Sequence, residues 1–351
     1  MKATRLYTAS QVKELDRRAI EGAGIPGITL MKRAAAATVA VMQEEFSGLR
    51  RCLVLCGTGN NAGDGYLVGG LLADKGIEVR IVMLGRVPEA ATDAGMAHAY
   101  ALNSSAECIS GNDTVANDID MVQEAAQADV IVDALLGIGL SGEVRPSYQA
   151  AIEVINASCK PIVAVDIPSG LSADTGAVQG KAQGACVKAT HTVTFVGRKL
   201  GLYTSDGPEY CGQVHFSSLN IPEAIYTDLE TDLETATVDL LELNSLQAQL
   251  KPRHRNTHKR AQGHLLVIGG NEGMGGAALL AAEAALYAGA GLVSVATHSS
   301  NVGAILARRP ELMPKPIART KDMQALLDQA TALVIGPGLG ADNWAKSLFK
   351  T

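Results

Sequence analysis

The composition of the chain sets the first limits on what the protein can be. The sequence has 351 residues, 47% hydrophobic and 19% charged, which is enough for two globular domains and too apolar for a disordered chain. Its 30 basic and 36 acidic side chains give a formal net charge of −6, so no global positive field attracts nucleic acid or anionic lipid. We therefore expect neither a nucleic acid nor a membrane as partner.

The cysteines and the amino terminus bear on where the protein works. Six cysteines are spread along the chain without a CxxC pair or a repeated spacing, which disfavours a zinc-binding or disulfide-stabilised scaffold. Residues 1–20 are charged and amphipathic and lack the apolar core of a secretory signal. The longest apolar stretch, residues 277–297, is interrupted by Glu283 and falls short of a membrane span. We expect a cytoplasmic protein.

Alternating apolar strands and helical segments dominate the first two thirds of the chain. Residues 10–46 predict helices, with Ser10 as the first N-cap. Residues 51–56 (RCLVLC) form a short apolar run before Gly57, which is typical of a buried parallel strand. Further strands are predicted at 79–84, 129–137, 161–168 and 191–197, and helices at 90–102 and 113–128. This alternation predicts an α/β fold, a Rossmann-like doubly wound parallel sheet with helices on both faces.

A change in composition marks a boundary after residue 225. The pattern weakens in an acidic stretch, and the basic segment KPRHRNTHKR, residues 251–260, follows it. A second α/β unit then begins, with strands predicted at 263–270, 292–297 and 332–340 and a helix at 275–289. Its length of about 100 residues is short for a domain, which predicts that it is cut off. We expect domains at 1–225 and 251–351, joined by a linker at 226–250.

The clearest candidate for a ligand site is CGTGNNAGDGY, residues 56–66, directly after the first strand. The spacing of Gly57, Gly59 and Ala62 matches the dinucleotide-binding fingerprint, in which backbone N–H groups and a helix N-terminus approach phosphate. A tight turn would explain the glycines and the two asparagines, which tolerate a left-handed backbone. It would not require Asp64, so the segment favours a binding site.

Two further carboxylates end apolar strands. Asp133 lies in VIVDALLGIGLSGEV and Asp166 in VAVDIPSGL. A carboxylate there can bind a cation or a ribose hydroxyl or transfer a proton, whereas a helix N-cap or a turn would explain either one alone. Because the carboxyl ends of parallel strands converge on one crevice, three polar strand ends together favour a site.

The second unit gives weaker signals. Its glycine loops GGNEGMGG and IGPGLG follow strands, and phosphate binding and close helix–sheet packing explain them equally well. The basic segment 251–260 can attract a phosphate, but a solvated linker is its more common meaning. The histidines show no metal-ligand spacing such as HExxH.

In its motifs the chain resembles a known family. The segments CGTGNNAGDGY, VDALLGIGLSGEV, VDIPSGLSADTG and HTVTFVGRKLGL, in this order, are similar to the NAD(P)H-hydrate epimerase domain. The segment HLLVIGGNEGMGGAALLAAEAALYAGAGLVSVAT, followed by LVIGPGLG, resembles the start of the ADP/ATP-dependent NAD(P)H-hydrate dehydratase domain, which has a ribokinase-like fold. Together the resemblances cover nearly the whole chain and imply a bifunctional repair enzyme, an isomerase joined to a lyase.

The resemblance implies roles for individual residues. The hydrated nicotinamide nucleotide would contact two loops, made of Asn60, Asn61, Ala62, Gly63 and Asp64 and of Gly137, Ile138, Gly139, Leu140, Ser141, Gly142 and Glu143. Asp166 would contact the reacting part of the substrate and serve as the catalytic residue. Asn61, Asp133 and Ser169 would coordinate potassium, because oxygen ligands of low total charge suit a hard monovalent cation. Ala277 and Gly340 would line the dehydratase substrate site, which would use ADP or ATP, with magnesium.

The expected activity is interconversion of the R and S forms of NAD(P)H hydrate in the first domain, by a chemical path that the sequence leaves open. The family's later dehydratase segments would lie beyond Thr351, so we expect the second unit to be incomplete and this chain to lack dehydratase activity. Two alternatives remain: a nucleotide- or partner-binding module without turnover, and an NAD-dependent oxidoreductase, which the polar GNNAGDG loop disfavours. We expect a homo-oligomer and leave open whether NADH or NADPH hydrate is preferred.

Overall fold

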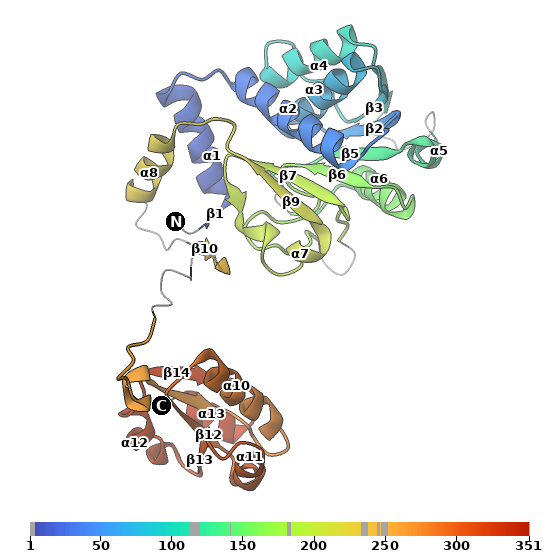
Figure 1. Cartoon of the computed structure of the whole chain (residues 1–351). Helices are drawn as coiled ribbons and strands as arrows, with labels where there is room; N and C mark the ends of the chain where they lie inside the picture. The colour runs from blue at the N-terminus through green and yellow to red at the C-terminus, as the bar shows by residue number, and fades with distance from the viewer. Residues whose placement is uncertain are drawn as a thin grey trace. The chain divides into compact units, whose positions relative to one another are not determined.

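The computed structural model divides the chain into two compact units, residues 1–247 and 248–351, which are described separately (Figure 1). The structure describes residues 4–111, 120–140, 142–180, 184–232, 238–243, 246 and 252–350. Among the described helices, none combines the length and the apolar composition that a membrane span requires.

The first unit is built on a seven-stranded sheet in the order β4-β3-β2-β5-β6-β7-β9, in which every neighbouring pair is parallel. The strands are β2 (Arg51–Cys56), β3 (Glu78–Leu84), β4 (Glu107–Gly111), β5 (Val130–Ala134), β6 (Ile162–Val165), β7 (His191–Phe195) and β9 (Gln213–Ser217). The predicted α/β class is confirmed. Because the chain leaves β2 toward β3 and later returns to β5 on the other side of β2, the strand order reverses between β2 and β5, where ligands bind in open α/β sheets.

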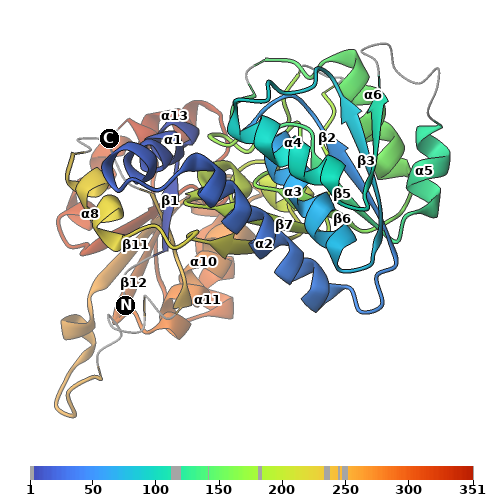
Figure 2. The same ribbon diagram turned by 90° about the horizontal axis from the view of Figure 1, so that it is seen from above.

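Helices cover both faces of this sheet (Figures 1 and 2). On one face lie α2 (Gly27–Glu45), α3 (Asn60–Asp74) and α4 (Asp93–Asn103), and on the other α5 (Met121–Gln127) and α6 (Pro146–Ala157). Successive residues of β2 point to opposite faces of the sheet. Cys52 and Val54 pack against α2, α3 and α4, and Leu53 and Leu55 pack against α5 and α6. This double burial explains the continuous apolar run of the strand.

The first unit also contains a smaller sheet in the order β10-β1-β8, and Tyr7 of β1 packs in the same core as α2 and α3. Its strands are β1 (Thr4–Tyr7), β8 (Arg198–Lys199) and β10 (Val238–Leu240), and the remaining helices are α1 (Ala9–Arg17), α7 (Gly207–Tyr210), α8 (Glu223–Asp232), the π-helical turn η1 (Arg18–Gly22) and the 3₁₀ turn η2 (Leu200–Leu202). The predicted N-cap Ser10 is wrong: Thr8 caps α1, since its side chain accepts from the Gln11 N–H while the Gln11 side chain accepts from the Thr8 N–H.

Several predicted elements differ from the structure in their bounds. The strands predicted at 129–137 and 161–168 end at Ala134 and Val165, because the residues after them turn away to form loops. The helix predicted at 113–128 begins at Met121, and residues 112–119 lie outside the described part of the chain. The edge strands β4 and β9 and helix α6 were not predicted.

The second unit holds a four-stranded parallel sheet in the order β13-β12-β11-β14. Its elements are β11 (His264–Ile268), α10 (Gly275–Ala288), β12 (Leu292–Thr297), α11 (Val302–Arg308), β13 (Met313–Pro316), α12 (Gln324–Leu327), β14 (Ala332–Ile335), α13 (Asn343–Phe349) and the 3₁₀ turns η3 (Lys259–Gln262), η4 (Ser299–Asn301) and η5 (Thr320–Asp322). Helices α10 and α11 pack on one face, and α12 and α13 on the other. Strand β14 exposes Leu333 and Ile335.

Candidate active site

A cavity of about 620 Å³ opens at the carboxyl ends of the strands in the first unit. Two loops form much of its wall, one between β2 and α3 and one after β5. They meet closely: the Gly57 N–H donates to the Ala134 carbonyl at 3.1 Å, and a Cβ at Gly57 would lie 2.0 Å from the Leu135 carbonyl oxygen. Only glycine fits there, which explains the first glycine of the loop. The size of the cavity is that of a typical small-molecule site.

A buried lysine and Asp166 form the charged centre of the cavity. Lys199, 1% exposed, forms an ion pair with Asp166, and its ammonium also donates to the Phe195 carbonyl at 2.8 Å. The Phe195 N–H donates to the same carboxylate oxygen of Asp166 at 3.2 Å. A lysine is almost never fully buried unless it is paired, so Lys199 and Asp166 are held together.

The backbone of Asp166 is unusual. Its φ of 68° lies in the left-handed region, which residues other than glycine rarely adopt. Its N–H still donates to the Val193 carbonyl at 2.8 Å, which fixes it between β6 and β7. Strained residues of this kind cluster at functional sites, since the surrounding structure must maintain them.

Burial raises the pKa of two further carboxyl groups in the cavity wall, Asp16 and Asp64. Burial, and then the negative charge of Asp166, raise the pKa of Asp16 to about 6. Burial raises the pKa of Asp64 well above its usual range, with Asp166 and Asp16 acting in the same direction and Lys199 opposing them. The cavity therefore holds carboxyl groups of raised pKa beside an ion-paired carboxylate, and perturbed groups of this kind are typical of sites for acid–base chemistry.

The residues predicted to hold potassium lie in one network behind the cavity. Asp133 and Ser169 are fully buried; the Ser169 N–H and hydroxyl donate to the two Asp133 oxygens at 2.8 and 2.6 Å. The Leu136 N–H donates to the Ser169 hydroxyl, and the Asn61 side-chain amide donates to the Leu136 carbonyl at 3.1 Å. The other Asn61 side-chain atom, Oδ1, is buried and has no hydrogen-bond partner among the described residues.

The oxygen atoms of this network are ligands that suit a hard cation. The network offers carboxylate, hydroxyl, amide and carbonyl oxygens, and the unpaired Asn61 Oδ1 is a ligand atom without a protein partner. Burial raises the pKa of Asp133 to about 6, and the hydrogen bonds from Ser169 oppose that shift. A cation beside Asp133 would favour its ionised form.

The structure brings most of the predicted substrate residues to the cavity wall. They are Asn60, Asn61, Asp64, Gly137, Ile138, Gly139, Leu140, Glu143 and Asp166. Ala62 and Gly63 are instead buried in α3, because they lie on the inner side of its first turn; a Cβ at Gly63 would lie 2.6 Å from the Met31 sulfur. Gly142 is exposed outside the wall, and Ser141 lies outside the described residues.

Sequence reasoning missed several charged groups of the cavity, among them Asp16 and Lys199. Asp16 sits one turn after Val12 on α1 and beside the buried Leu15, so an acidic residue next to an apolar stripe was the available signal. Lys199 lies within the segment HTVTFVGRKLGL, but nothing local marks it as buried; the pairing of β8 with β1 places it.

In the second unit, the two predicted residues border one loop. Ala277 lies in the first turn of α10, and its N–H donates to the Met274 carbonyl. Gly340 has a φ of 75°, and a Cβ there would lie 3.0 Å from the Met274 methyl carbon and 3.3 Å from the Asn271 side-chain nitrogen. Both therefore lie beside the 271–274 loop at the carboxyl end of β11.

The fold defines a two-unit α/β protein whose first unit contains a cavity lined by charged and titratable side chains. Sequence profiles of two families match: the one described as YjeF-related protein N-terminus at residues 27–201, and the one described as NAD(P)H-hydrate dehydratase at residues 265–351.

Curated relatives contain both parts. The chain is 41% identical over 350 residues to the bifunctional NAD(P)H-hydrate repair enzyme Nnr of Coxiella burnetii, covering 99% of this chain and 67% of the relative. It is 38% identical to the enzyme of the same name from Escherichia coli, covering 98% of this chain and 63% of that relative. The chain belongs to the bifunctional NAD(P)H-hydrate repair enzyme family, and it spans about two thirds of the length of these relatives.

A solved structure supports the fold. The yeast protein ynu0 superposes with a TM-score of 0.54 at 17% sequence identity, covering 67% of this chain and all of the yeast chain. At that identity the likeness shows the fold alone.

Proposed function

We propose that the cavity of the first unit interconverts the R and S forms of NAD(P)H hydrate. The observation that carries the proposal is the Lys199–Asp166 ion pair, which lies beside the raised-pKa carboxyls of Asp16 and Asp64 in one cavity. The family, whose members are named hydrate repair enzymes, supplies the substrate class.

The chemistry needs a proton donor and a proton acceptor. The carbon that inverts bears a hydroxyl group and the ring nitrogen, so a bond from it must break and re-form on the other face. If the hydroxyl leaves as water, a carboxylic acid supplies a proton to it, and a carboxylate takes a proton from the water that returns. Asp64 holds the proton that such an acid needs, while Asp166, fixed by Lys199, provides the carboxylate. The same two groups also serve a path through ring opening.

The loops position the nucleotide for this chemistry. Helix α3 begins at Asn60, so its first N–H groups and its dipole favour negative charge beside the Asn60–Asn61 loop. Lys13 and Arg145 also line the cavity and can offset phosphate charge. Of the second loop, Gly137 to Leu140 and Glu143 face the same space.

A monovalent cation, potassium in this proposal, would bind to Asn61, Asp133 and Ser169. It would neutralise the buried Asp133 carboxylate. These three residues fix the loops after β2, β5 and β6 relative to one another through their hydrogen bonds.

For the second unit we propose the dehydratase substrate site beside Ala277 and Gly340, with ADP or ATP, and magnesium, as cofactors. Dehydratase activity of these residues is tested by ATP- or ADP-dependent loss of the S hydrate with return of NAD(P)H absorbance. We also propose a homo-oligomer in the cytoplasm; all six cysteines are free, which suits a reducing compartment.

The test of the epimerase is direct. Starting from chromatographically pure R hydrate, the purified chain should bring R and S to their equilibrium ratio much faster than buffer does, without added nucleotide. A parallel assay of hydride transfer to common carbonyl substrates should be negative. Binding of the hydrate without faster interconversion would favour the non-catalytic module, and hydride transfer would favour an oxidoreductase.

A further inference from the structure

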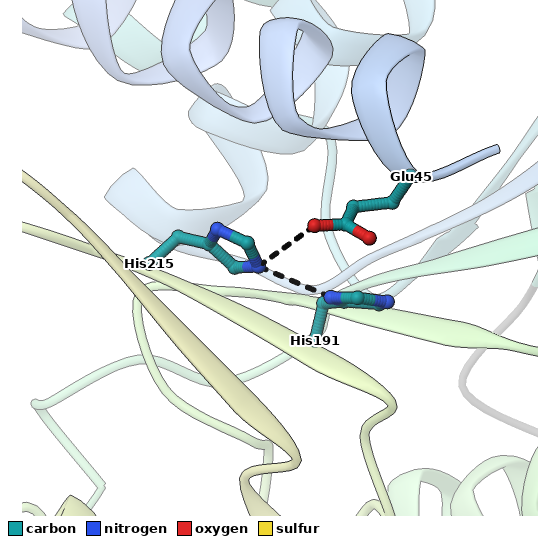
Figure 3. A group of neighbouring side chains, drawn as sticks. All are labelled: Glu45, His191 and His215. Atoms are coloured by element: carbon teal, nitrogen blue, oxygen red, sulfur yellow. Dashed lines mark hydrogen bonds and ion pairs between the residues drawn. The ribbon is translucent and has the colours of Figure 1, made fainter.

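A second polar cluster lies in the first unit, away from the cavity. Glu45, the last residue of α2, points toward His191 at the start of β7 and His215 within β9 (Figure 3). One ligand atom from each of the three lies within 4.8 Å of the others. Among the described residues this is the one group of three His, Cys, Asp or Glu side chains with such spacing.

The fold explains why these side chains meet. In the parallel pairing of β7 and β9, Val193 lies opposite His215, so His191 and His215 are diagonal neighbours on one face of the sheet. Helix α2 packs on that face, and its end brings Glu45 over the pair, while the Phe46 ring packs edge-on against His191. His191 is buried and His215 half-buried, whereas Glu45 is exposed.

The distances suit a shared ion. His191 Nδ1 and His215 Nε2 are 3.1 Å apart, and two imidazole nitrogens bound tetrahedrally at zinc–nitrogen distances are separated by about 3.3 Å. Glu45 Oε1 lies 3.9 Å from His215 Nε2, which is too long for a hydrogen bond and needs a shift of only about 0.5 Å to join the same ion. The Glu45 side chain is 28% exposed and belongs to the last residue of α2, which leaves room for that shift.

We propose that Glu45, His191 and His215 bind a borderline divalent cation of the zinc class, with water in the open position. Two imidazoles and one carboxylate form a ligand set that zinc and cobalt accept, and at pH 7.5 ordinary imidazoles are neutral and able to coordinate. The ion ties the end of α2 to β7 and β9. It lies about 13 Å from the cavity wall, since His191 begins β7 and Phe195, four residues later, lines the cavity.

The test uses the untagged full chain and Co²⁺ as the probe. We expect one Co²⁺ per chain with the visible absorption of a four- or five-coordinate nitrogen–oxygen site, displaced by Zn²⁺, and a higher melting temperature with the ion bound. Glu45→Gln keeps the volume and should weaken binding at least about tenfold, and His215→Ala should abolish it. His254→Ala and Cys159→Ser, which change an exposed histidine and the exposed thiol, are the matched controls and should bind as the parent does.

Each other outcome counts against the site. No stoichiometric Co²⁺ absorption in the parent chain would show that the pair is only a histidine–histidine hydrogen bond. Equal affinity in the parent and Glu45→Gln would remove Glu45 from the site, and loss of the signal in Cys159→Ser would assign the ion to the thiol. Because Glu45 is exposed, its variant folds and the test remains decisive even if His215→Ala does not.

Discussion

Among the described carboxyl groups with a shifted pKa, those that are raised all lie in the first unit, whereas both units contain lowered ones, such as Glu14 and Asp129 in the first. In the first, burial raises the pKa of Asp16 and Asp133 to about 6 and that of Asp64 well above its usual range. In the described part of the second unit, the shifted pKa values are lowered. Arg309 and Arg308 hold the pKa of Glu283 below its usual range, and the hydrogen bond from the Ala345 N–H lowers the pKa of Asp342.

The difference concerns function. A carboxyl that keeps its proton near neutral pH can donate it in a reaction, whereas a carboxylate fixed by an arginine or a helix N–H mainly holds structure. Such a structural carboxylate is Asp342, which accepts a hydrogen bond from the Asn271 side chain at 2.9 Å and so holds the 271–274 loop to the start of α13. The raised carboxyls are therefore the reason for which we propose acid–base chemistry in the first unit.

The largest expected effect is on epimerisation. Asp166→Asn removes the carboxylate at nearly constant volume, and we expect the rate to fall about 10²–10⁴-fold while circular dichroism still shows a folded chain. Asp228→Asn, on the exposed side of α8, is the control and should keep the parent rate. A folded Asp166→Asn chain with the parent rate would make Asp166 structural.

The next effect is on stability. Lys199→Met leaves the Asp166 carboxylate in the cavity without its cation, and breaking such a buried pair costs about 3 kcal/mol of unfolding free energy. In the double variant with Asp166→Asn the unpaired charge is gone, so part of the loss should return. Denaturant unfolding of the four chains measures this coupling; strictly additive losses would mean that the pair is not coupled.

A cation at Asp133 predicts a pH-dependent effect of potassium. Since the folded pKa of about 6 exceeds the unfolded value of about 3.9, the stability linked to Asp133 is complete below the unfolded value. As pH rises through 6, up to about 3 kcal/mol of it is lost when no cation is bound. Potassium should therefore raise the melting temperature more at pH 7.5 than at pH 5, relative to tetramethylammonium, and less in Asp133→Asn. Equal effects of the two salts would contradict a cation site.

The smallest effect concerns the edge of the second sheet. Leu333 is 54% exposed on β14, so Leu333→Thr should change the unfolding free energy by no more than about 0.5 kcal/mol. Leu266→Ala, in the buried centre of β11, should cost about 2–5 kcal/mol in the same assay. A large loss from Leu333→Thr would show that this face of β14 is covered in solution.

The sequence predicts the central strands well and the edges poorly. The strands at 51–56 and 292–297 match to the residue, because both are continuous apolar runs buried in a sheet. Strand β9 (QVHFS) lies at the sheet edge with polar residues and an exposed Phe216, so no apolar run marks it.

The same contrast holds for the candidate sites. Asp64 and Asp166 follow strands and Asp133 lies near the end of β5, and parallel topology brings such residues together. Asp16 and Lys199 reach the cavity through packing of α1 and pairing of β8 with β1; Asp16 has a local signal in the apolar stripe beside it, whereas Lys199 has none. The cluster of Glu45, His191 and His215 likewise joins residues far apart in the chain.

The pH profile of epimerisation, compared between the parent chain and Asp16→Asn, tests most directly whether the carboxyl cluster carries the reaction. Below pH 6 Asp16 gains a proton beside Asp166, which weakens proton removal, so the parent rate should fall as pH drops through about 6. In Asp16→Asn that titration is absent, and the fall should move to lower pH. An unchanged fall near pH 6 in Asp16→Asn would contradict the account.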